Sequence, residues 1–155
     1  MVKLPQLSID TERVDQCFGC GKNNPIGLKL SFQWDGKSAR TEFTPAEVYQ
    51  GWLGVVHGGI VMAMLDEAVS YAAFFEGMSC VTAEMQARLK RPALVGEPLI
   101  ITGIITKKTR RFIEAKATIC LKDGTLVAEG EATQVVIEPK REDKSKRNGK
   151  PKSDA

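Results

Sequence analysis

The chain has 155 residues, of which 43% are hydrophobic and 26% charged, a composition ordinary for one globular domain. Its net charge of +3 comes from the end of the chain, KREDKSKRNGKPKSDA, which holds seven basic and three acidic residues and leaves 15 basic against 16 acidic residues elsewhere. The body is therefore no basic nucleic-acid binder, and we expect residues 139–155 to form a disordered basic tail.

The N-terminal residues MVKLPQLSIDTERVD contain no apolar stretch of the kind found in secretion signals. No run reaches the roughly 18 apolar residues that cross a bilayer, because Asp66 and Glu67 interrupt the longest candidate. We therefore expect a cytoplasmic protein that makes no membrane contact, with residues 1–16 as a short extension before the domain.

The four cysteines are Cys17, Cys20, Cys80 and Cys120. The segment CFGCG has the spacing of a zinc knuckle, but a structural zinc site needs four ligands. His57 is the only histidine and the other two cysteines stand alone, so we expect no metal, and a reducing compartment disfavours a disulfide. The turn-rich segment 17–27 is instead predicted to form a compact loop that leads into the first strand.

Two short strand-like runs, residues 28–34 and 38–44, are joined by Asp-Gly-Lys, a strong hairpin signal. A helix is predicted from about Gly58 to Phe75, because this stretch has no proline and no glycine after Gly59, and Gly77 follows as a stop signal. Its residues are apolar around most of the circumference, so we expect other structure to envelop the helix.

Three long strand-like segments follow, over residues 81–91, 97–110 and 111–138, and a second Asp-Gly turn divides the last one. The order of a hairpin, one long helix and antiparallel strands predicts an α+β fold. We expect one domain over residues 17–138, in which a curved antiparallel sheet of about five to six strands wraps around one central helix.

The stretch VVHGGIVMAMLDEAVSYAAFF places His-Gly-Gly at the start of this helix and two carboxylates in its middle. Glycines at a helix start leave N–H groups that suit a carbonyl oxygen becoming an oxyanion. A carboxylate in an apolar setting can act as base or nucleophile. Together they predict acyl transfer, in its simplest form the hydrolysis of a thioester, and no G-x-S-x-G motif competes.

Gly59 and Asp66 are seven residues apart, or about 10 Å along a helix axis. A general base must come within about 3 Å of the group it serves, so two different chains have to supply these two elements if both act in one site. A tight turn before a helix would explain Gly58 and Gly59 equally well, and His57 could be a structural residue. Spacing alone does not decide between Asp66 and Glu67.

The segment GVVHGGIVMAMLDEA resembles the signature of hotdog-fold acyl-CoA thioesterases, specifically the phenylacetic-acid-pathway (PaaI-like) subfamily. The segment CFGCGKNNPIGLKL resembles an N-terminal element of many members of that superfamily, so the resemblance extends from about Cys17 to Glu138. It implies the hotdog fold, homodimers with a continuous sheet, often homotetramers, and hydrolysis of acyl-CoA. Coenzyme A would be part of the substrate, and no cofactor is implied.

The resemblance also assigns roles to residues. Asp66 matches the family's base or nucleophile, and Gly59 would polarise the thioester carbonyl through its N–H. The remaining catalytic candidates support these two: His57 and Gly58 shape the turn, Gln50 lies near the reaction centre, and Thr82 helps to position water. Glu67 would then be a supporting or interfacial residue.

Coenzyme A also carries phosphates. Arg88, Lys90 and Arg91 are the candidates to bind them by charge-assisted hydrogen bonds, although each alone is explained as a solvated charge at a sheet edge. Side chains such as Met62, Met64, Tyr71 and Phe74 suggest a medium-chain or aromatic acyl group, but core packing explains them as well.

Two other functions are compatible with such a domain. A hotdog hydratase or dehydratase would need an acid five residues before the histidine, where this chain has Trp52. A non-catalytic acyl-CoA sensor could use the same pocket, but it would not need the carboxylate of Asp66.

Overall fold

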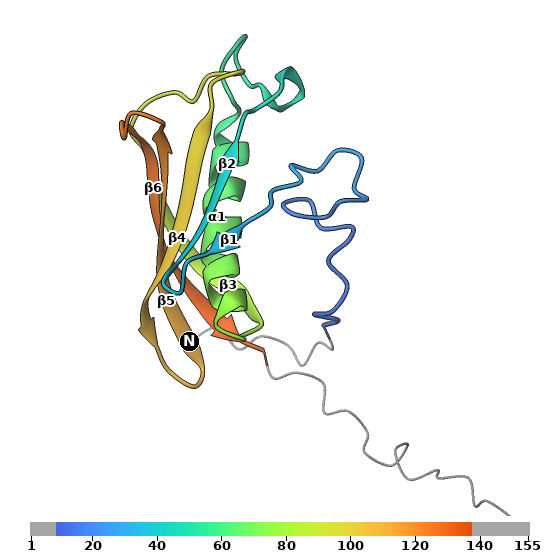
Figure 1. Cartoon of the computed structure of the whole chain (residues 1–155), viewed down its shortest axis with the longest axis vertical. Coiled ribbons are helices and arrows are strands. Elements are labelled where there is room, and N and C mark those ends of the chain that lie inside the picture. Colours follow the sequence, from blue (N-terminus) through green and yellow to red (C-terminus); the bar gives the residue numbers. More distant parts are fainter. Residues whose placement is uncertain (1–8, 138–155) are drawn as a thin grey trace, which may run out of the picture.

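One long helix lies against one face of a six-stranded antiparallel sheet (Figure 1). The structure is a computed structural model that describes residues 9–137. Its elements are β1 (Gln33–Trp34), β2 (Ser38–Phe43), a short 3-10 helix η1 (Glu47–Tyr49), α1 (Gly58–Phe75), β3 (Cys80–Leu89), β4 (Leu99–Lys108), β5 (Phe112–Leu121) and β6 (Leu126–Val136). The expected α+β architecture is confirmed, whereas the tail predicted for residues 139–155 lies outside the described residues.

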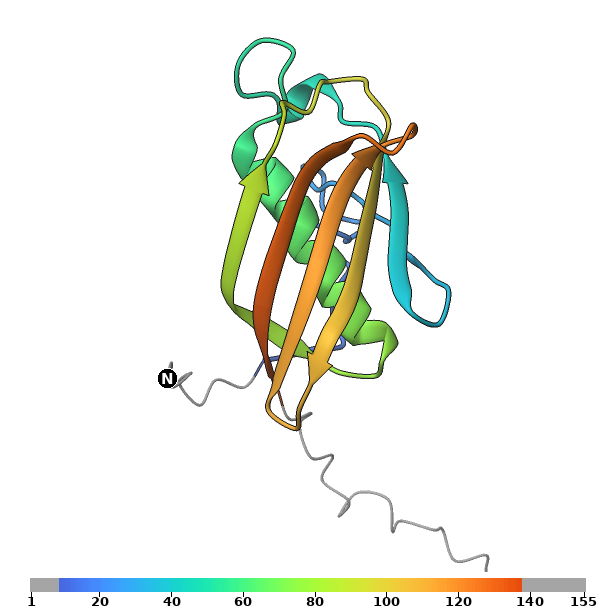
Figure 2. The same ribbon diagram turned by 90° about the vertical axis from the view of Figure 1, so that its left-hand side faces the viewer.

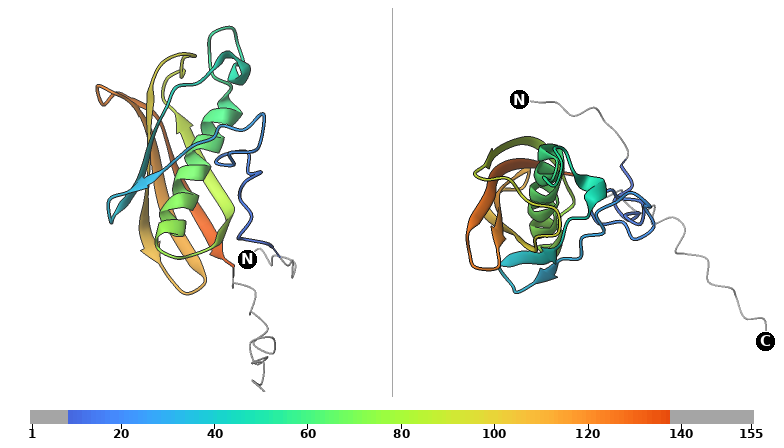
Figure 3. Two further views of the ribbon diagram at one scale, coloured as in Figure 1. Left: turned by 45° about the vertical axis from the view of Figure 1, so that its right-hand side comes forward. Right: turned by 90° about the horizontal axis from the view of Figure 1, so that it is seen from above.

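The strands follow the spatial order β1-β2-β4-β5-β6-β3. The strand that follows the helix, β3, therefore forms one edge of the sheet, and its neighbour is the last strand, β6 (Figure 2). Seen from above, the sheet curves around one side of α1, and the N-terminal segment lies on the opposite side (Figure 3).

The bounds of α1 agree with the prediction. His57 caps its start, because the imidazole Nδ1 accepts a hydrogen bond from the Gly59 N–H at 2.9 Å. At the other end Gly77 has a φ of +79°, which glycine adopts without strain, and the Met78 N–H bonds back to the carbonyl of Ala73.

The expectation that other structure envelops α1 is met only in part. Its buried residues recur every three or four positions and form a single stripe that faces the sheet: Val61, Met64, Leu65, Ala68, Val69, Ala72 and Ala73. On the other face, 43% of Met62 and 59% of Phe74 remain exposed. The apolar residues outside the stripe are thus only partly covered within one chain.

By length and composition alone, α1 reaches the range of a membrane-spanning helix, with a mean hydropathy of 1.3 over 18 residues. This differs from the sequence expectation, because the two adjacent carboxylates do not lower the average enough. In the fold α1 is the core helix of the sheet, and a mostly apolar core helix has the same composition.

The close approach of α1 to the sheet depends on Gly103 in the middle of β4. A Cβ atom at this position would lie 2.1 Å from the carbonyl oxygen of Ala68, so no other residue fits without moving the helix. Small residues on both sides of this contact allow the helix to lie flat on the strands, and Leu99 and Ile101 of β4 are buried beneath it.

The first hairpin is shorter than predicted. Asp35 accepts hydrogen bonds from the N–H of Lys37 and of Ser38, and Gly36 has a φ of +94°, so the Asp-Gly turn is confirmed. Residues 28–32, however, do not join the sheet. These residues alternate between buried and exposed as a strand does, with Leu28 and Leu30 buried. The N–H groups of Leu28 and Leu30, however, donate to carbonyls of the cysteine loop and not to a strand.

Candidate functional site

A cavity of about 690 Å³ opens at the start of α1. Its wall includes Trp52 from the preceding loop, His57 and Gly58 from the helix start, and Lys90 and Arg91 from the segment after β3. Most of the remaining lining is aliphatic or glycine, and none of the lining residues carries a carboxylate. The cavity thus combines an apolar wall, a helix N-terminus and two cations, which suits an anionic ligand with an apolar part.

The two glycines at the helix start differ in what their N–H groups do. The Gly59 N–H donates to the ring of its own neighbour His57, which places the imidazole proton on Nε2. The Gly58 N–H has no hydrogen-bond partner within the described residues, and Gly58, unlike Gly59, lines the cavity. The unpaired donor among the glycines at the helix start is therefore the N–H of Gly58, and the Gly59 N–H is free only when the His57 ring turns away.

Gln50, the third candidate from this region, supports the loop before the helix. Its Oε1 accepts a hydrogen bond from the Gly54 N–H at 3.1 Å, and its backbone bridges to Val56. Gln50 does not line the cavity at the start of α1.

Asp66 and Thr82, predicted to share a site, are brought together by the fold. The Thr82 hydroxyl donates to Asp66 Oδ1 at 2.6 Å, across the gap between α1 and β3. The register of β3 shifts between Thr82 and Glu84, a bulge of the kind that re-aims side chains next to functional sites.

Gln134 completes this network and was missed by the sequence reasoning. Its Nε2 donates to Thr82 Oγ1 at 3.2 Å and to Ser70 Oγ at 2.9 Å. An amide nitrogen is only a donor, so the Thr82 hydroxyl has to direct its own proton toward Asp66. Gln134 is fully buried and its Oε1 has no hydrogen-bond partner. The signal that could have found it is a polar residue at an inward position of β6, two residues after the buried Ala132.

The two groups of residues are not close to each other within one chain. Asp66 is eight residues after Gly58, which corresponds to about 12 Å along the helix axis. Neither Asp66 nor Thr82 lines the cavity at the helix start. One chain therefore contains a polarising end and a carboxylate, but it does not bring them together.

The edge strand β3 is the part of the sheet that lacks cover. No residue of β3 is buried, whereas β4, β5 and β6 each bury alternate residues. Large apolar side chains of this part of the chain are exposed as well: Leu89 of β3 is 47% exposed, Met62 of α1 43% and Trp52 86%. An edge of ten residues with unpaired backbone groups is a surface to which another strand can pair.

The second carboxylate, Glu67, points away from Asp66. It lies under the cysteine loop, with its Oε1 3.5 Å from the Sγ of Cys17. Burial raises the pKa of Glu67 above its usual range. The fold thus directs Asp66 to a hydroxyl and Glu67 to two thiols, which separates the roles of the two acids.

The three basic candidates for phosphate binding lie in two different places. Lys90 and Arg91 line the cavity and form ion pairs with Glu129 at 3.5 Å and with Glu97 at 3.6 Å. Arg88 lies elsewhere, in a group with Lys116 on the outer face of the sheet.

The four side chains suggested for acyl recognition are also dispersed. None of them lines the cavity at the helix start. Met64 belongs to the core, and Tyr71 stacks on Phe32 with a centroid distance of 4.8 Å. Tyr71 and Phe74 line a smaller cavity over Glu67.

The sequence profile of the thioesterase superfamily matches residues 53–128, from the loop before α1 to the start of β6. This part of the chain is similar to the thioesterase superfamily. An uncharacterised protein of Schizosaccharomyces pombe is 32% identical over 77 residues, which are 48% of this chain and 42% of that protein. The chain thus spans less than half the length of this yeast relative.

Solved structures of the superfamily have the same fold. A crystallised thioesterase superfamily protein is 28% identical, with a TM-score of 0.73, over 78% of this chain and 60% of that one. A hypothetical thioesterase of Streptococcus pneumoniae, crystallised with coenzyme A, is 15% identical, with a TM-score of 0.67, over 71% and 87%. The PaaI protein of E. coli is 19% identical, with a TM-score of 0.66, over 70% and 83%. The likeness to this superfamily establishes the hotdog fold that the resemblance implied.

The Streptococcus pneumoniae protein was also crystallised as two variants, one with an aspartate and one with a threonine changed to alanine. These two positions are 16 residues apart. Asp66 and Thr82 of the present chain have the same separation of 16 residues.

Proposed function

We propose that the protein hydrolyses the thioester of an acyl-CoA. The observation that carries this proposal is that α1 holds two complementary groups. The unpaired N–H of Gly58 lies at an apolar cavity at the start of the helix, and the carboxylate of Asp66, with the Thr82 hydroxyl bonded to it, lies in the middle of the helix. The match of residues 53–128 to the thioesterase superfamily supports the reaction class, and a structural neighbour crystallised with coenzyme A supports the ligand class. The shared spacing of the aspartate and the threonine supports the choice of Asp66 and Thr82.

In the proposed mechanism the thioester carbonyl accepts a hydrogen bond from the Gly58 N–H at the positive end of α1, and Gly59 is a second donor once the His57 ring turns. Fixed donors stabilise the negative charge that develops on this oxygen. Asp66 takes a proton from water as the water oxygen attacks the carbonyl carbon, or it attacks the carbon itself. The carbon–sulfur bond then breaks, and the thiolate of coenzyme A leaves and is protonated. If Asp66 itself attacks, the acyl group is left on its carboxylate as an anhydride, and water hydrolyses this anhydride to release the acid and restore Asp66.

The proposed site needs two copies of the chain. Pairing of β3 with β3 of a second copy would continue the sheet and cover the exposed apolar side chains around Leu89 and Met62. Antiparallel pairing would also bring Asp66 of one copy toward the helix start of the other. We therefore propose a homodimer as the active form, with Lys90 and Arg91 meeting the phosphates of coenzyme A at the rim of the cavity.

Within the superfamily, we propose the PaaI-like subfamily and an acyl group of small to medium size or with an aromatic ring. The proposal rests on the His-Gly-Gly and Asp segment, with PaaI itself among the structural neighbours. A hydratase is disfavoured because Trp52 occupies the position where an acid would be needed, and the cavity wall contains no carboxylate.

The purified full chain tests the function against a panel of short, medium, long and aryl acyl-CoAs, with the released thiol measured. We expect turnover of at least one class and no hydration of an enoyl-CoA. Tight binding of the same compounds without release of thiol would instead identify a non-catalytic acyl-CoA binding protein.

A further inference from the structure

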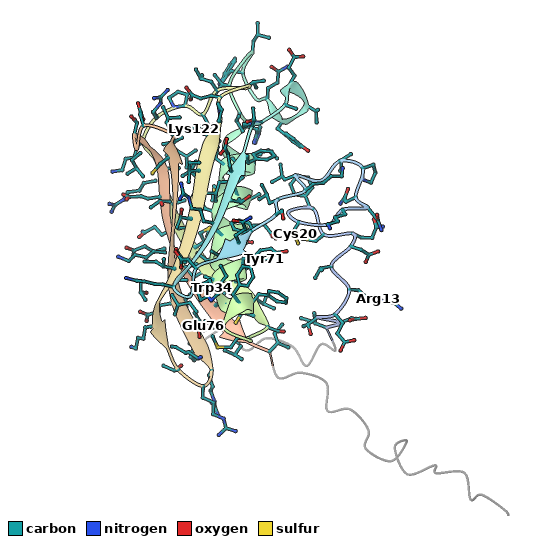
Figure 4. All side chains as sticks on the ribbon, viewed as in Figure 1. Arg13, Cys20, Trp34, Tyr71, Glu76 and Lys122 are labelled. Carbon is teal, nitrogen blue, oxygen red and sulfur yellow. The ribbon has the colours of Figure 1, made fainter. Side chains whose placement is uncertain are left out.

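The loop that contains Cys17 and Cys20 lies over the middle of α1, directly above Glu67. The sulfur atoms of the two cysteines and a carboxylate oxygen of Glu67 all lie within 4.8 Å of one another, and Cys17 Sγ is 3.5 Å from Glu67 Oε1. Figure 4 shows Cys20 beside Tyr71, one helical turn beyond Glu67. The sequence reasoning considered only cysteine and histidine as ligands and so did not anticipate Glu67.

These distances fit a tetrahedral metal ion. Zinc bonds of about 2.3 Å to sulfur and about 2.1 Å to oxygen give a sulfur–oxygen separation of about 3.6 Å and a sulfur–sulfur separation of about 3.8 Å. The observed 3.5 Å between Cys17 Sγ and Glu67 Oε1 agrees with the first value. The upper limit of 4.8 Å for the whole group means that the remaining pairs move together by up to about 1 Å when the ion binds.

The backbone of the loop is shaped to hold the two sulfur atoms over the carboxylate. Gly19 passes so close to Glu67 that a Cβ atom would lie 2.1 Å from its Cγ, and a Cβ atom on Gly21 would lie 2.4 Å from the Cys17 nitrogen. The Gly21 N–H donates to the Cys17 carbonyl at 2.8 Å, which closes the turn. Glycine at both positions is therefore needed for this arrangement.

The charge of Glu67 has no counter-ion in the part of the chain that the structure describes, where no lysine, arginine or histidine forms an ion pair with it. A divalent cation would stabilise the deprotonated form of all three groups, because thiolate and carboxylate are the forms that bind metal.

A fourth coordination position is also open. The group lines a cavity of about 200 Å³ together with Tyr71 and Cys80, which has room for a water ligand. Structural zinc sites usually have four protein ligands; here three protein ligands and one water would complete the tetrahedral coordination sphere.

We propose that Cys17, Cys20 and Glu67 bind a zinc ion that fastens the N-terminal loop to α1. The ion would be structural with respect to the thioester, because Asp66 is directed to Thr82 and does not belong to the group. This inference goes beyond the proposed hydrolase function and does not depend on it.

The test is the metal content of the full chain, purified under reducing conditions without a chelator. We expect about one zinc per chain. Cobalt added to metal-free protein should give the thiolate-to-cobalt charge-transfer absorption of a site with two thiolates. The double variant Cys17→Ser/Cys20→Ser should lose both signals, and Glu67→Gln should lower the zinc affinity. Cys120→Ser, which changes a cysteine outside the group, is the matched control and should retain both.

The site would be refuted if the wild-type chain held no more zinc than the double variant and gave no cobalt absorption. Zinc present in equal amounts in both chains would then be an adventitious ion only. A Cys17–Cys20 disulfide found by mass in the wild-type chain under the same reducing conditions would also refute it. If the double variant does not fold, the site is tested by the zinc affinity of Glu67→Gln and by the cobalt spectrum of the wild-type chain: unchanged affinity and no charge-transfer absorption would refute it. None of these readouts uses hydrolytic activity.

Discussion

The start and the middle of α1 carry complementary halves of one chemistry. At the start, the Gly58 N–H and two cations surround an apolar cavity, and no carboxylate lines it. In the middle, Asp66 accepts a hydrogen bond from Thr82, whose proton is directed by the buried Gln134. The first region can bind and polarise a thioester, and the second can activate a nucleophile, but about 12 Å of helix separates them.

The separation of the two regions on one helix gives the exposed edge of the sheet a function. A single chain that needed both regions in one site would place them on facing elements, not on one helix. Instead, the chain leaves β3 unpaired on one side and exposes apolar residues beside it. The two regions can act on one substrate only if a second copy of the chain supplies the missing one.

The largest effect is expected in the middle of the helix. Asp66→Asn keeps the shape of the side chain and removes its charge, so kcat should fall by about 10²-fold or more, because the general base or nucleophile is lost. Substrate binding and thermal stability should change little. Glu84→Gln, which removes an exposed carboxylate from the same strand as Thr82, is the control and should keep full activity. A large loss of stability with intact turnover in Asp66→Asn would show that Asp66 is structural.

At the start of the helix, Gly58→Pro removes one N–H and keeps the fold. Proline is favoured at the first helical position, and His57, with φ of −57° and ψ of 133°, already has the conformation that precedes proline. Loss of one oxyanion donor should lower kcat by about 10²-fold. Gly58→Ala retains the N–H, and its Cβ would make an ordinary contact of 3.5 Å with Leu89. Equal activity of the proline and alanine variants would assign the donor to another group.

A smaller effect is expected from Gln134→Met, which preserves volume and removes the amide that orients Thr82. We expect kcat to fall about tenfold with KM unchanged, equivalent to about 1.4 kcal/mol in the barrier. Stability should change little or increase, since the variant also removes the buried Oε1 that has no partner. A fall in stability with unchanged kcat would show that Gln134 serves only the core.

The smallest effect concerns the cations, and the fold supplies its own control. Lys90→Ala/Arg91→Ala should raise the KM for acyl-CoA several-fold with kcat nearly unchanged, because phosphate contacts are made equally in the ground and transition states. Arg88→Ala, on the outer face, should leave KM unaltered. A thioester that lacks the phosphates of coenzyme A should not distinguish the two variants. Equal effects of both variants on acyl-CoA would mean that general surface charge, not the cavity rim, attracts the substrate.

Much of the fold was predictable because its signals are local. The bounds of α1 follow from the glycines that flank it, and both Asp-Gly turns contain a glycine at positive φ. The failures involve tertiary contacts. Residues 28–32 have strand periodicity but bond to a loop, and the outer face of α1 is apolar for reasons that one chain does not reveal.

The site shows the same limit. Asp66 and Thr82 were expected to cooperate, and the fold brings them together at 2.6 Å. The hydrogen bond between His57 and Gly59 could not be read from the sequence, because it depends on the rotamer of the capping side chain. The partners of Gln134 and Glu67 depend on how a distant strand and a loop pack on the helix, which residue spacing does not encode.

The central claim is that the polarising N–H and Asp66 of one active site come from different copies of the chain. Co-expression of separately tagged Gly58→Pro and Asp66→Asn chains, followed by purification on both tags, isolates the mixed dimer. One of its two sites then has both wild-type residues, and the other has neither. We predict that both homodimers are nearly inactive and that the mixed dimer regains about half of the wild-type rate per dimer, since one of two sites is intact. A mixed dimer that stays inactive, although each variant folds and dimerises, would show that both residues act within one chain and would contradict the account.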